Sequence, residues 1–369
     1  MKRVGLLSAL WFCCIAIGWS QSSYANLKLV AQIKKAHCQY PRWSKNGNKL
    51  SYEVRHVSRS IIEIRIHTWG SAGKHKVVNP AALQSGGLGL GVHVEKRGMV
   101  AREVAWSPKA NKYLFSSNGT GTVYNVYLSG SGPLKLNSRL KNDGQPAWSK
   151  NGKYVAFTSG RSGNGDIYYT RMSGKLKARR LTKFGTSTEL FPTWSPKSNL
   201  SLAYIRHTEQ SDRIYVVKNI FIKRSKRLTK WGKKVSELNP SWSPNGKHIA
   251  FFGQYANGRY DLFVTKVSTG KTVRLAKNVV KGDQFGPAWA PNSKHIFYVQ
   301  KLSQNKDKIM AVNVGSKAKK GISTGTVVNN ELSVASKGGK WLIAFTAQGT
   351  TKSVGLVYRK LYVKTVSPF

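Results

Sequence analysis

Short runs of apolar residues alternate with polar, turn-forming residues along most of this chain. The stretch "PAWSKNGKYVAFTS", which begins at Pro146, is typical: an apolar run ends in Trp148, a polar turn follows, and a second apolar run spans 154–158. Runs of this length that are bounded by Gly, Asn and Ser predict β-strands. The pair Asn151-Gly152 predicts a short hairpin, because both residue types accept a positive φ angle.

The same stretch recurs along the chain, so we treat it as a repeat. The aligned positions are Trp43, Trp106, Trp148, Trp194, Trp242, Trp289 and, in a degenerate copy, Ala335. Their successive spacings are 63, 42, 46, 48, 47 and 46 residues. A period in the forties predicts an architecture in which each repeat is one supersecondary unit.

Each repeat has room for four strands. In the copy at 145–182 we expect them at 146–148, 154–158, 166–171 and 178–181, separated by Gly, Ser and Asn turns. Four antiparallel strands joined by tight turns form one blade of a β-propeller. The recurring tryptophan is then expected to pack between neighbouring blades.

The number of second strands predicts the number of blades. These strands contain Leu50, Leu114, Val155, Leu202, Ile249, Ile296 and Ile343. We therefore predict an all-β, seven-bladed propeller of four-stranded antiparallel blades, with six blades as the alternative. The last repeat lacks an obvious fourth strand after Val363. We expect "LKLVAQI" at 27–33 to supply it and close the ring, which leaves no sheet edge exposed.

Several motifs resemble those of a known family. The sequence W-S-P-N-G-K, the stretch "GDIYY" and the endings "RRLT" and "KRLT" are similar to those of TolB-like (WSPDG-repeat) β-propellers. The resemblance covers nearly all of the chain after residue 25. It implies a propeller fold in a family that includes a periplasmic protein and the propeller parts of prolyl-oligopeptidase-like enzymes. The family motif usually carries Asp where this chain has Asn151 and Asn245.

The N-terminus has the features of a secretory signal peptide. Lys2 and Arg3 precede an apolar stretch at 4–19, and small residues lead up to Ala25. We predict a signal peptide at 1–25, a single propeller domain at 26–369, and a secreted or periplasmic location. A membrane anchor is the alternative, but the apolar stretch is shorter than the roughly 20 residues that a spanning helix needs.

One cysteine, Cys38, remains after the predicted cleavage site. A single cysteine cannot form an internal disulfide, so we do not expect this fold to depend on one. We expect a buried thiol, and the alternative is a disulfide between two chains.

The few acidic residues recur at fixed places in the repeat. The chain has 61 basic and 14 acidic residues and a net charge of +47. Acids or, in the first repeat, a histidine precede the first strands: His37, Glu103, Asp143, Glu189, Glu237, Asp283 and Glu331. Others begin the third strands: Asp166, Asp212, Asp261 and Asp307. In an up-and-down blade these places share one end, so we expect an acidic ring at one mouth of the channel.

This acidic ring has two interpretations. The carboxylates can cap backbone N–H groups or pair with arginines, in which case they are structural. They can also bind a substrate or a hard cation such as Ca²⁺ or Mn²⁺, which prefers oxygen ligands. We expect no cofactor, with the divalent cation as the alternative.

Lysines collect in the turns at the opposite end. Those between first and second strands are Lys45, Lys49, Lys109, Lys112, Lys150, Lys153, Lys197, Lys247, Lys294, Lys337 and Lys340. Turns between third and fourth strands add Lys74, Lys175, Lys223, Lys271 and Lys317. Because repulsion among so many like charges opposes compaction, we expect this face to contact an anionic polymer: lipopolysaccharide, an acidic glycan or nucleic acid. A general adaptation to the environment is the alternative.

Motifs for catalysis are scarce. The sequence has no G-x-S-x-G motif, which a serine hydrolase of the α/β type carries. The glycine-rich "GGLGLGV" at 86–92 lacks the strand-to-helix context of a dinucleotide site. It lies in an insertion at 80–102, which we expect to overhang the acidic mouth. The family resemblance extends to polysaccharide lyases that hold a metal with histidine and other side chains, and here His37 alone joins the acidic ring.

We therefore predict a non-catalytic, exported propeller scaffold that binds an envelope protein partner, does not span the membrane after signal cleavage, and is a monomer. Its basic face is expected to contact anionic envelope polymers. The alternative is a metal-dependent, lyase-like enzyme that acts on an acidic glycan at the channel mouth.

Overall fold

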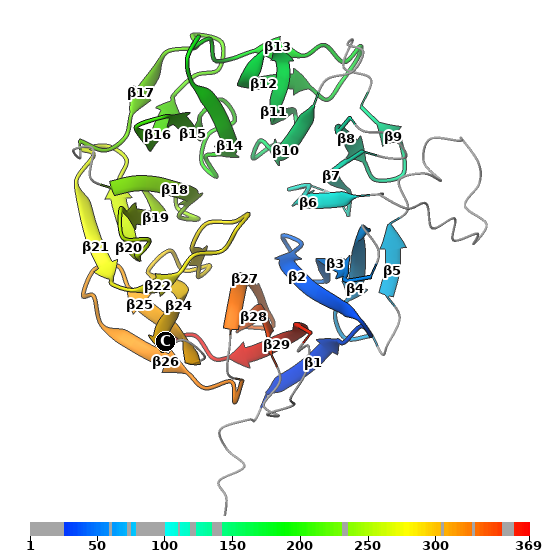
Figure 1. Cartoon of the computed structure of the whole chain (residues 1–369), viewed down its shortest axis with the longest axis vertical. Coiled ribbons are helices and arrows are strands. Elements are labelled where there is room, and N and C mark those ends of the chain that lie inside the picture. The colour runs from blue at the N-terminus through cyan, green and yellow to red at the C-terminus, as the bar shows by residue number, and fades with distance from the viewer. Residues whose placement is uncertain are drawn as a thin grey trace, which may run out of the picture.

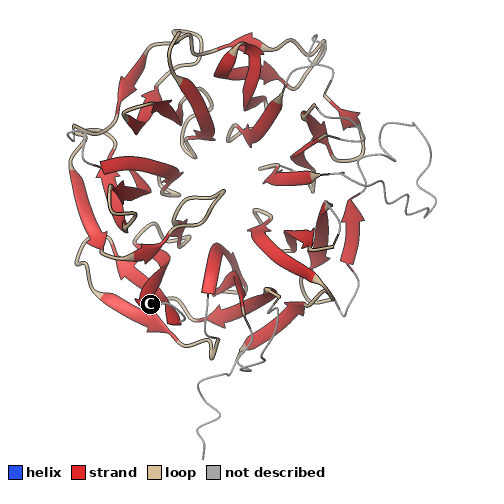
Figure 2. Cartoon of the chain, in the orientation of Figure 1, coloured by secondary structure: helices blue, strands red, loops and turns tan. Residues whose placement is uncertain are grey.

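The computed structural model forms a closed ring of β-sheets around a central channel (Figures 1 and 2). It describes residues 26–58, 61–71, 75–78, 100–109, 111–118, 123–134, 142–230, 235–303, 306–326, 329–348 and 358–369. All regular elements in these ranges are strands. Within them there is no helix long and apolar enough to cross a membrane. The predicted signal peptide, the glycine-rich stretch and most of the 80–102 insertion lie outside the described residues.

Seven sheets make up the ring, as the repeats predicted, and we number them as blades I to VII. Blade I contains β2 (Ala36–Trp43), β3 (Lys49–His56), β4 (Ile62–Thr68) and β5 (His75–Val78). Blade II contains β6 (Ala101–Trp106), β7 (Tyr113–Ser117), β8 (Asn125–Leu128) and β9 (Gly132–Pro133). Blade III contains β10 (Asp143–Trp148), β11 (Tyr154–Ser162), β12 (Asn164–Arg171) and β13 (Arg179–Arg180).

The next three blades follow the same order, with one irregularity in blade VI. Blade IV contains β14 (Thr188–Trp194), β15 (Leu202–Thr208), β16 (Ser211–Val217) and β17 (Ser225–Arg227). Blade V contains β18 (Val235–Trp242), β19 (His248–Tyr255), β20 (Tyr260–Lys266) and β21 (Thr272–Ala276). Blade VI contains β22 (Val279–Val280), β23 (Ala288–Trp289), β24 (His295–Ser303), β25 (Lys306–Asn313) and β26 (Lys319–Ile322). Its first strand is split, and both halves pair with β24.

Blade VII joins the two ends of the chain. It contains β27 (Asn329–Lys337), β28 (Lys340–Ala347), β29 (Lys360–Val366) and, as its outermost strand, β1 (Leu27–Ala31). Leu27 pairs with Lys364 and Leu29 with Tyr362 in an antiparallel ladder. The prediction that the segment at 27–33 closes the ring is confirmed, and the six-blade alternative is wrong.

The repeated tryptophans link successive blades. The indole Nε1–H of Trp194 donates to the carbonyl oxygen of Ala147 in the preceding blade at 3.0 Å. The same bond, at 3.0 to 3.1 Å, is made by Trp106, Trp148, Trp242 and Trp289. Since their rings also pack against the apolar clusters between blades, the predicted inter-blade role is confirmed. Trp43 is buried, as Trp194 and Trp289 are, but its Nε1 has no partner among the described residues.

The predicted hairpin at Asn151-Gly152 is present, since β10 and β11 pair antiparallel across it, but Gly152 alone of the pair has a positive φ (67°). Asn151 instead uses its Oδ1 to accept hydrogen bonds from Ser149 Oγ and the Lys153 N–H. In blade VII the tryptophan position is Val334 rather than Ala335, since Val334 pairs with Ile343 as Trp148 pairs with Val155.

Cys38 lies fully buried in the cluster between blades VII and I. Burial raises the pKa of its thiol to about 12. Such a thiol is unreactive at neutral pH, so the geometry favours the buried-thiol interpretation over a disulfide between chains.

Candidate binding site at the channel mouth

The first strands of the blades surround a central cavity of about 730 Å³. In every blade except VI, whose first strand is split, the first strand is irregular at the third position before the tryptophan position, where its pairing with the second strand shifts register. In six blades the residue there has a positive φ angle: Tyr40, Glu103, Gln145, Phe191, Asn239 and Glu331. A bulge of this kind re-aims the side chain, and these residues line the channel or its rim.

Side-chain oxygens at the bulges fasten one blade to the next. Glu331 accepts the Tyr40 N–H of blade I at 2.6 Å, and Glu103 accepts the Gln145 N–H of blade III at 2.7 Å. Gln145 in turn accepts the Phe191 N–H at 2.8 Å. We call these three residues and Glu53 the inter-blade acceptors.

Glu53 of β3 completes the sequence of acceptors at blade I, where the bulge residue is Tyr40. Its Oε1 accepts the Glu103 N–H at 2.8 Å. In blades II and III the corresponding second-strand residues are Ser116 and Thr158, and each donates to the acceptor of its own blade. A carboxylate therefore replaces a hydroxyl at this place in blade I.

Burial changes the ionisation of two of these acids. It raises the pKa of Glu53 to about 8, although the Glu103 N–H opposes the change. It raises the pKa of Glu331 to about 7, opposed by the Tyr40 N–H. Burial also lowers the pKa of the nearby Arg42 to about 9. Near neutral pH this wall of the channel is thus less negative than its carboxyl groups suggest.

A loop at 281–287, between the two halves of the first strand of blade VI, projects toward the channel axis (Figures 1 and 2). Its Phe285 ring lies under the Arg42 guanidinium, 3.0 Å from Cζ to the ring centroid. Asp283 Oδ2 accepts the Tyr40 hydroxyl at 3.1 Å, and Gln284 Nε2 lies 3.4 Å from Glu53 Oε2. The loop from blade VI therefore reaches blade I.

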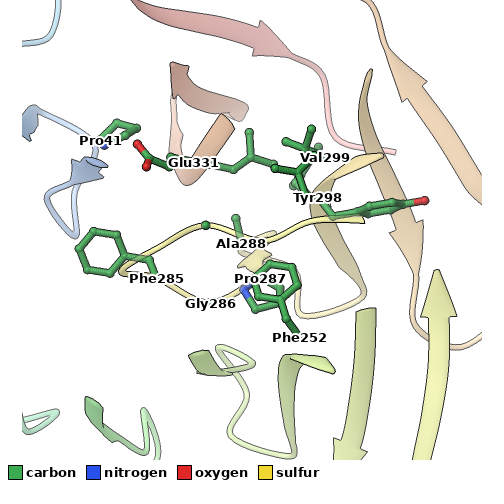
Figure 3. A pocket seen from close by; sticks show the side chains of 13 residues that line it. Pro41, Phe252, Phe285, Gly286, Pro287, Ala288, Tyr298, Val299 and Glu331 are labelled. Carbon is green, nitrogen blue, oxygen red and sulfur yellow. The ribbon is translucent and has the colours of Figure 1, made fainter. Parts of the chain in front are cut away.

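Blade V holds the base of this loop. The Asn239 Nδ2 lies 3.1 to 3.3 Å from the carbonyl oxygens of Gly282, Asp283 and Phe285. A Cβ on Gly286 would lie 2.2 Å from the Asn239 carbonyl oxygen, so glycine is required there. Figure 3 shows the loop and the side chains around a small cavity of about 30 Å³ that Pro41, Phe285, Pro287 and Glu331 help to line.

The structure brings only part of the predicted acidic ring together. Glu331 and Asp283 lie near Tyr40 together with Glu53, and Glu103 adjoins Glu53. Asp283 differs from the other three because its side chain is 68% exposed.

The remaining members of the predicted ring lie away from this group. Asp143 pairs with Arg161 at 2.5 Å. Glu189 is buried beside Ser187 and Arg206, and burial raises its pKa to about 7. Glu237 accepts the Ile214 N–H of blade IV at 2.9 Å, which places it between two blades. His37 Nδ1 accepts the Arg359 N–H, and burial, with Arg359 and Arg55, lowers its pKa.

The acids that begin the third strands sit at the same end of the blades. The register aligns Asp166 with Ser159 and Asp143, and Asp261 with Gly253 and Glu237. Asp166 and Asp261 are buried and pair with arginines, and Asp212 pairs with His207. Asp307 begins the third strand of blade VI. Within the described residues, no three His, Cys, Asp or Glu side chains are grouped so that they could hold a metal ion.

The lysines of the turns between first and second strands occupy the other end. Ten of the eleven predicted members are exposed, and Lys49 is half-buried. In the part of the chain that the structure describes, none of the eleven forms an ion pair. The Asn of the turn accepts the same bonds in three blades, through Asn46, Asn151 and Asn245.

Sequence reasoning missed two parts of the channel mouth. Glu53 could have been found as the one acid within a predicted second strand. The second strand of the first repeat reads "LSYEVR", whereas that of the third repeat reads "YVAFTS" and has no acid. The loop at 281–287 replaces strand residues rather than adding residues, so the spacing of 47 between Trp242 and Trp289 did not reveal it. Its two glycines and Asp283 were the available signal.

Comparison with known proteins supports the fold. Residues 91–233 and 185–362 match the family described as TolB beta propeller domain. The Tol-Pal system protein TolB of Desulfosudis oleivorans is 26% identical over 130 residues, which are 35% of this chain and 26% of that protein. The match thus spans about a quarter of the length of this curated relative.

Solved structures with different activities share the architecture. TolB from Acinetobacter baumannii is 18% identical, with a TM-score of 0.52 over 75% of this chain and 63% of that chain. An oligogalacturonate lyase from Vibrio parahaemolyticus is 7% identical, with a TM-score of 0.62 over 93% and 97%. An oligogalacturonate lyase in complex with manganese is 8% identical, with a TM-score of 0.62 over 90% of each chain. At these identities the likeness is one of fold.

Proposed function

Because this chain belongs to the TolB beta-propeller family, we propose that it is a non-catalytic scaffold that docks a protein partner at the acid-bearing mouth of its channel. One observation carries the proposal. The carboxyl groups of Glu53, Glu103 and Glu331 are already used to fasten blades together, while the exposed Asp283 and the loop that carries it remain open to a partner.

The proposal includes export and a basic face. Residues 1–25 have the pattern of a signal peptide, and the curated relative is by name a protein of the Tol-Pal system. The exposed lysines at the opposite end supply charge that favours contact with anionic envelope polymers. Such contact among exposed groups weakens as salt shortens the screening length from about 8 Å at physiological ionic strength.

A pull-down from envelope extract tests the docking site. The bound material is washed at about 0.15 M and about 0.5 M salt, which separates charge-driven from shape-driven contacts. We expect a protein that survives the stronger wash with the wild type and is lost with Phe285→Ala or Asp283→Arg. Retention of polymer alone, released at high salt, contradicts a shaped docking site.

The lyase-like alternative requires a divalent ion at the acidic ring. This protein shares its fold with the manganese-bound lyase. Its predicted metal ligands, however, are divided between the channel and the gaps between blades. Adding Ca²⁺ or Mn²⁺ to the purified protein tests this directly. A rise in melting temperature that Glu189→Gln and Glu237→Gln abolish supports the enzyme, and no rise supports the scaffold.

A further inference from the structure

The turn between β16 and β17 carries two adjacent apolar side chains that solvent reaches. Phe221 is 52% exposed and Ile222 is 71% exposed. Other large exposed apolar residues, such as Leu302 and Val57, occur singly. Single exposed apolar residues are normal on a soluble protein, whereas clustered ones mark interaction sites. We call residues 218–226 the apolar turn.

The apolar turn lies at the lysine-bearing end of the molecule. Val217 ends β16 and pairs with Leu202, the first residue of β15, so the turn emerges at the same end as the loop before β15. The turn itself carries four exposed cations: Lys218, Lys223, Arg224 and Lys226. In the neighbouring blade, Tyr154 packs against Phe221 with ring centroids 6.0 Å apart, and the exposed Lys153 and Arg171 flank that tyrosine.

Acidic side chains are absent from this end in the part of the chain that the structure describes. The described acids lie on the channel or at the opposite end of the blades, as the strand registers place them. The cations around Phe221 and Ile222 are therefore available to an external anion.

Backbone N–H groups of the apolar turn are already hydrogen-bonded within the protein. The Phe221 N–H donates to Asn219 Oδ1 at 2.9 Å. The N–H groups of Ile222 and Lys223 both donate to the Asn219 carbonyl oxygen at 3.1 Å. The buried Ile220 anchors the turn on the blade III side. An unpaired N–H group raises the free energy of a segment in an apolar medium. Because these N–H groups are already bonded, they add little free-energy cost when the turn enters such a medium.

We propose that the apolar turn is a membrane-surface anchor: Phe221 and Ile222 enter the interface of an anionic phospholipid bilayer while the surrounding lysines and arginines contact the lipid headgroups. Interfacial binding of this kind combines buried apolar area with attraction to anionic lipids. A soluble anionic polymer offers charge but no apolar layer, so it gives no role to the two exposed side chains. The inference does not depend on the protein partner proposed above, because the channel-mouth loop lies at the opposite end of the blades.

Sedimentation with lipid vesicles tests the proposal on the purified full chain. One set of vesicles is phosphatidylcholine alone, and the other contains about one third phosphatidylglycerol, which supplies the anionic surface. Any binding through residues 1–25 is common to the wild type and to the variants described below, so the comparison between them corrects for it. We expect markedly stronger binding to the anionic vesicles.

Matched variants separate the apolar contact from charge alone. The double variant Phe221→Gln/Ile222→Gln should weaken binding to anionic vesicles roughly tenfold or more, since it removes two large side chains from the interface. Leu302, 53% exposed at the opposite end, provides the control, and Leu302→Gln should bind as the wild type does. Unchanged melting temperatures establish that both variants are folded.

Binding to heparin distinguishes a lipid surface from a soluble polyanion. The double variant should retain heparin binding, because its cations are intact, and Lys223→Glu/Arg224→Glu should weaken binding to both ligands. The proposal is overturned if the double variant binds anionic vesicles as tightly as the wild type. It is equally overturned if the wild type binds heparin but shows no preference for anionic vesicles.

Discussion

At the scale of single residues, two kinds of side chain hold the blades together. Tryptophan indoles donate to carbonyl oxygens of the preceding blade, near the lysine-bearing end of the channel. The inter-blade acceptors receive N–H groups of the following blade, deeper along the same strands. In blades II and III the indole donor and the side-chain acceptor are thus only three residues apart in the first strand, and each of these two blades is fixed to its neighbours at two points.

The indole bond predicts a difference between two buried tryptophans. Trp194→Phe removes the indole donor from the Ala147 carbonyl oxygen and should lower the free energy of unfolding by about 0.5–1.5 kcal/mol beyond the loss of packing. Trp43→Phe is the control, because the Trp43 indole has no described partner to lose. Urea unfolding of both variants measures the difference. Equal losses would show that the indole bond contributes little.

Burial of Glu53 predicts a stability that depends on pH. The folded protein holds the Glu53 pKa at about 8, above its ordinary value of 4.5. Folding therefore favours the protonated acid, so this contribution is complete below about pH 4.5 and is lost as the pH rises through about 8. The loss is on the order of a few kcal/mol, since one unit of raised pKa corresponds to about 1.4 kcal/mol.

The variant Glu53→Gln should show a shallower decline across this window. Its amide oxygen can still accept the Glu103 N–H, and its NH₂ group can donate to Gln284 Oε1, which has no partner in the described structure. Glu63→Gln, which removes a carboxylate paired with Arg65 at 2.6 Å, should leave the decline in place. Urea unfolding at a series of pH values provides the test, and equal slopes for wild type and Glu53→Gln would contradict it.

At the scale of elements, the split first strand of blade VI decides the shape of the channel mouth. Where other blades continue as a bulged strand, blade VI sends out the loop at 281–287, which Asn239 holds from blade V and Arg42 meets from blade I. Contacts with two other blades position a segment that has no regular structure of its own.

Gly286 is the position at which this arrangement is most sensitive. Gly286→Ala places a methyl group against the Asn239 backbone, and overpacking of this kind costs typically 1–3 kcal/mol. We expect a loss of that size in thermal or urea unfolding, together with weaker partner retention. Gly185→Ala, where an added Cβ meets no atom within 4 Å, is the control and should be close to neutral. A neutral Gly286→Ala would show that the loop shifts freely.

Most of the elements could be predicted from sequence, and the reason is periodicity. Each repeat has the same alternation of apolar strand and polar turn, so a strand assigned in one copy is also assigned in the others. Even the closing role of 27–31 followed from the strand missing in blade VII. The channel mouth was harder. Glu103 and Asp143 look equivalent in sequence, because each precedes the tryptophan of its repeat. Glu103, however, is three residues before its tryptophan and stands at the bulge, which directs its side chain to the channel. Asp143 is five residues before its tryptophan, ahead of the bulge, and pairs with Arg161.

At the scale of the whole molecule, charge is separated between the two ends of the blades. Asparagine makes this separation compatible with the fold, because Asn151 and Asn245 accept the turn bonds that an aspartate of the family motif would accept, without its charge. The lysine-bearing end consequently keeps its turn geometry while losing every described acid.

The net charge of +47 predicts that salt stabilises the protein. Raising NaCl to about 0.5 M shortens the screening length and weakens repulsion among the lysines. We expect a gain on the order of 1 kcal/mol, or about 2 °C or more in melting temperature. Sorbitol at equal osmolality controls for effects other than screening and should give a smaller rise. A melting temperature that is insensitive to NaCl would indicate that the lysines are too far apart to repel.

The pairing of β1 with β29 also sets the order of events during synthesis. The residues that β1 needs are made long after β1 itself, since Leu27 pairs with Lys364. Until then blade VII lacks its outer strand, and the earlier blades form an open arc rather than a ring. Bringing distant segments together is slow, because the entropy of closing the intervening loop is lost before the contacts form. The nascent chain therefore stays an open arc, with sheet edges that chaperones can recognise, until β29 has been made.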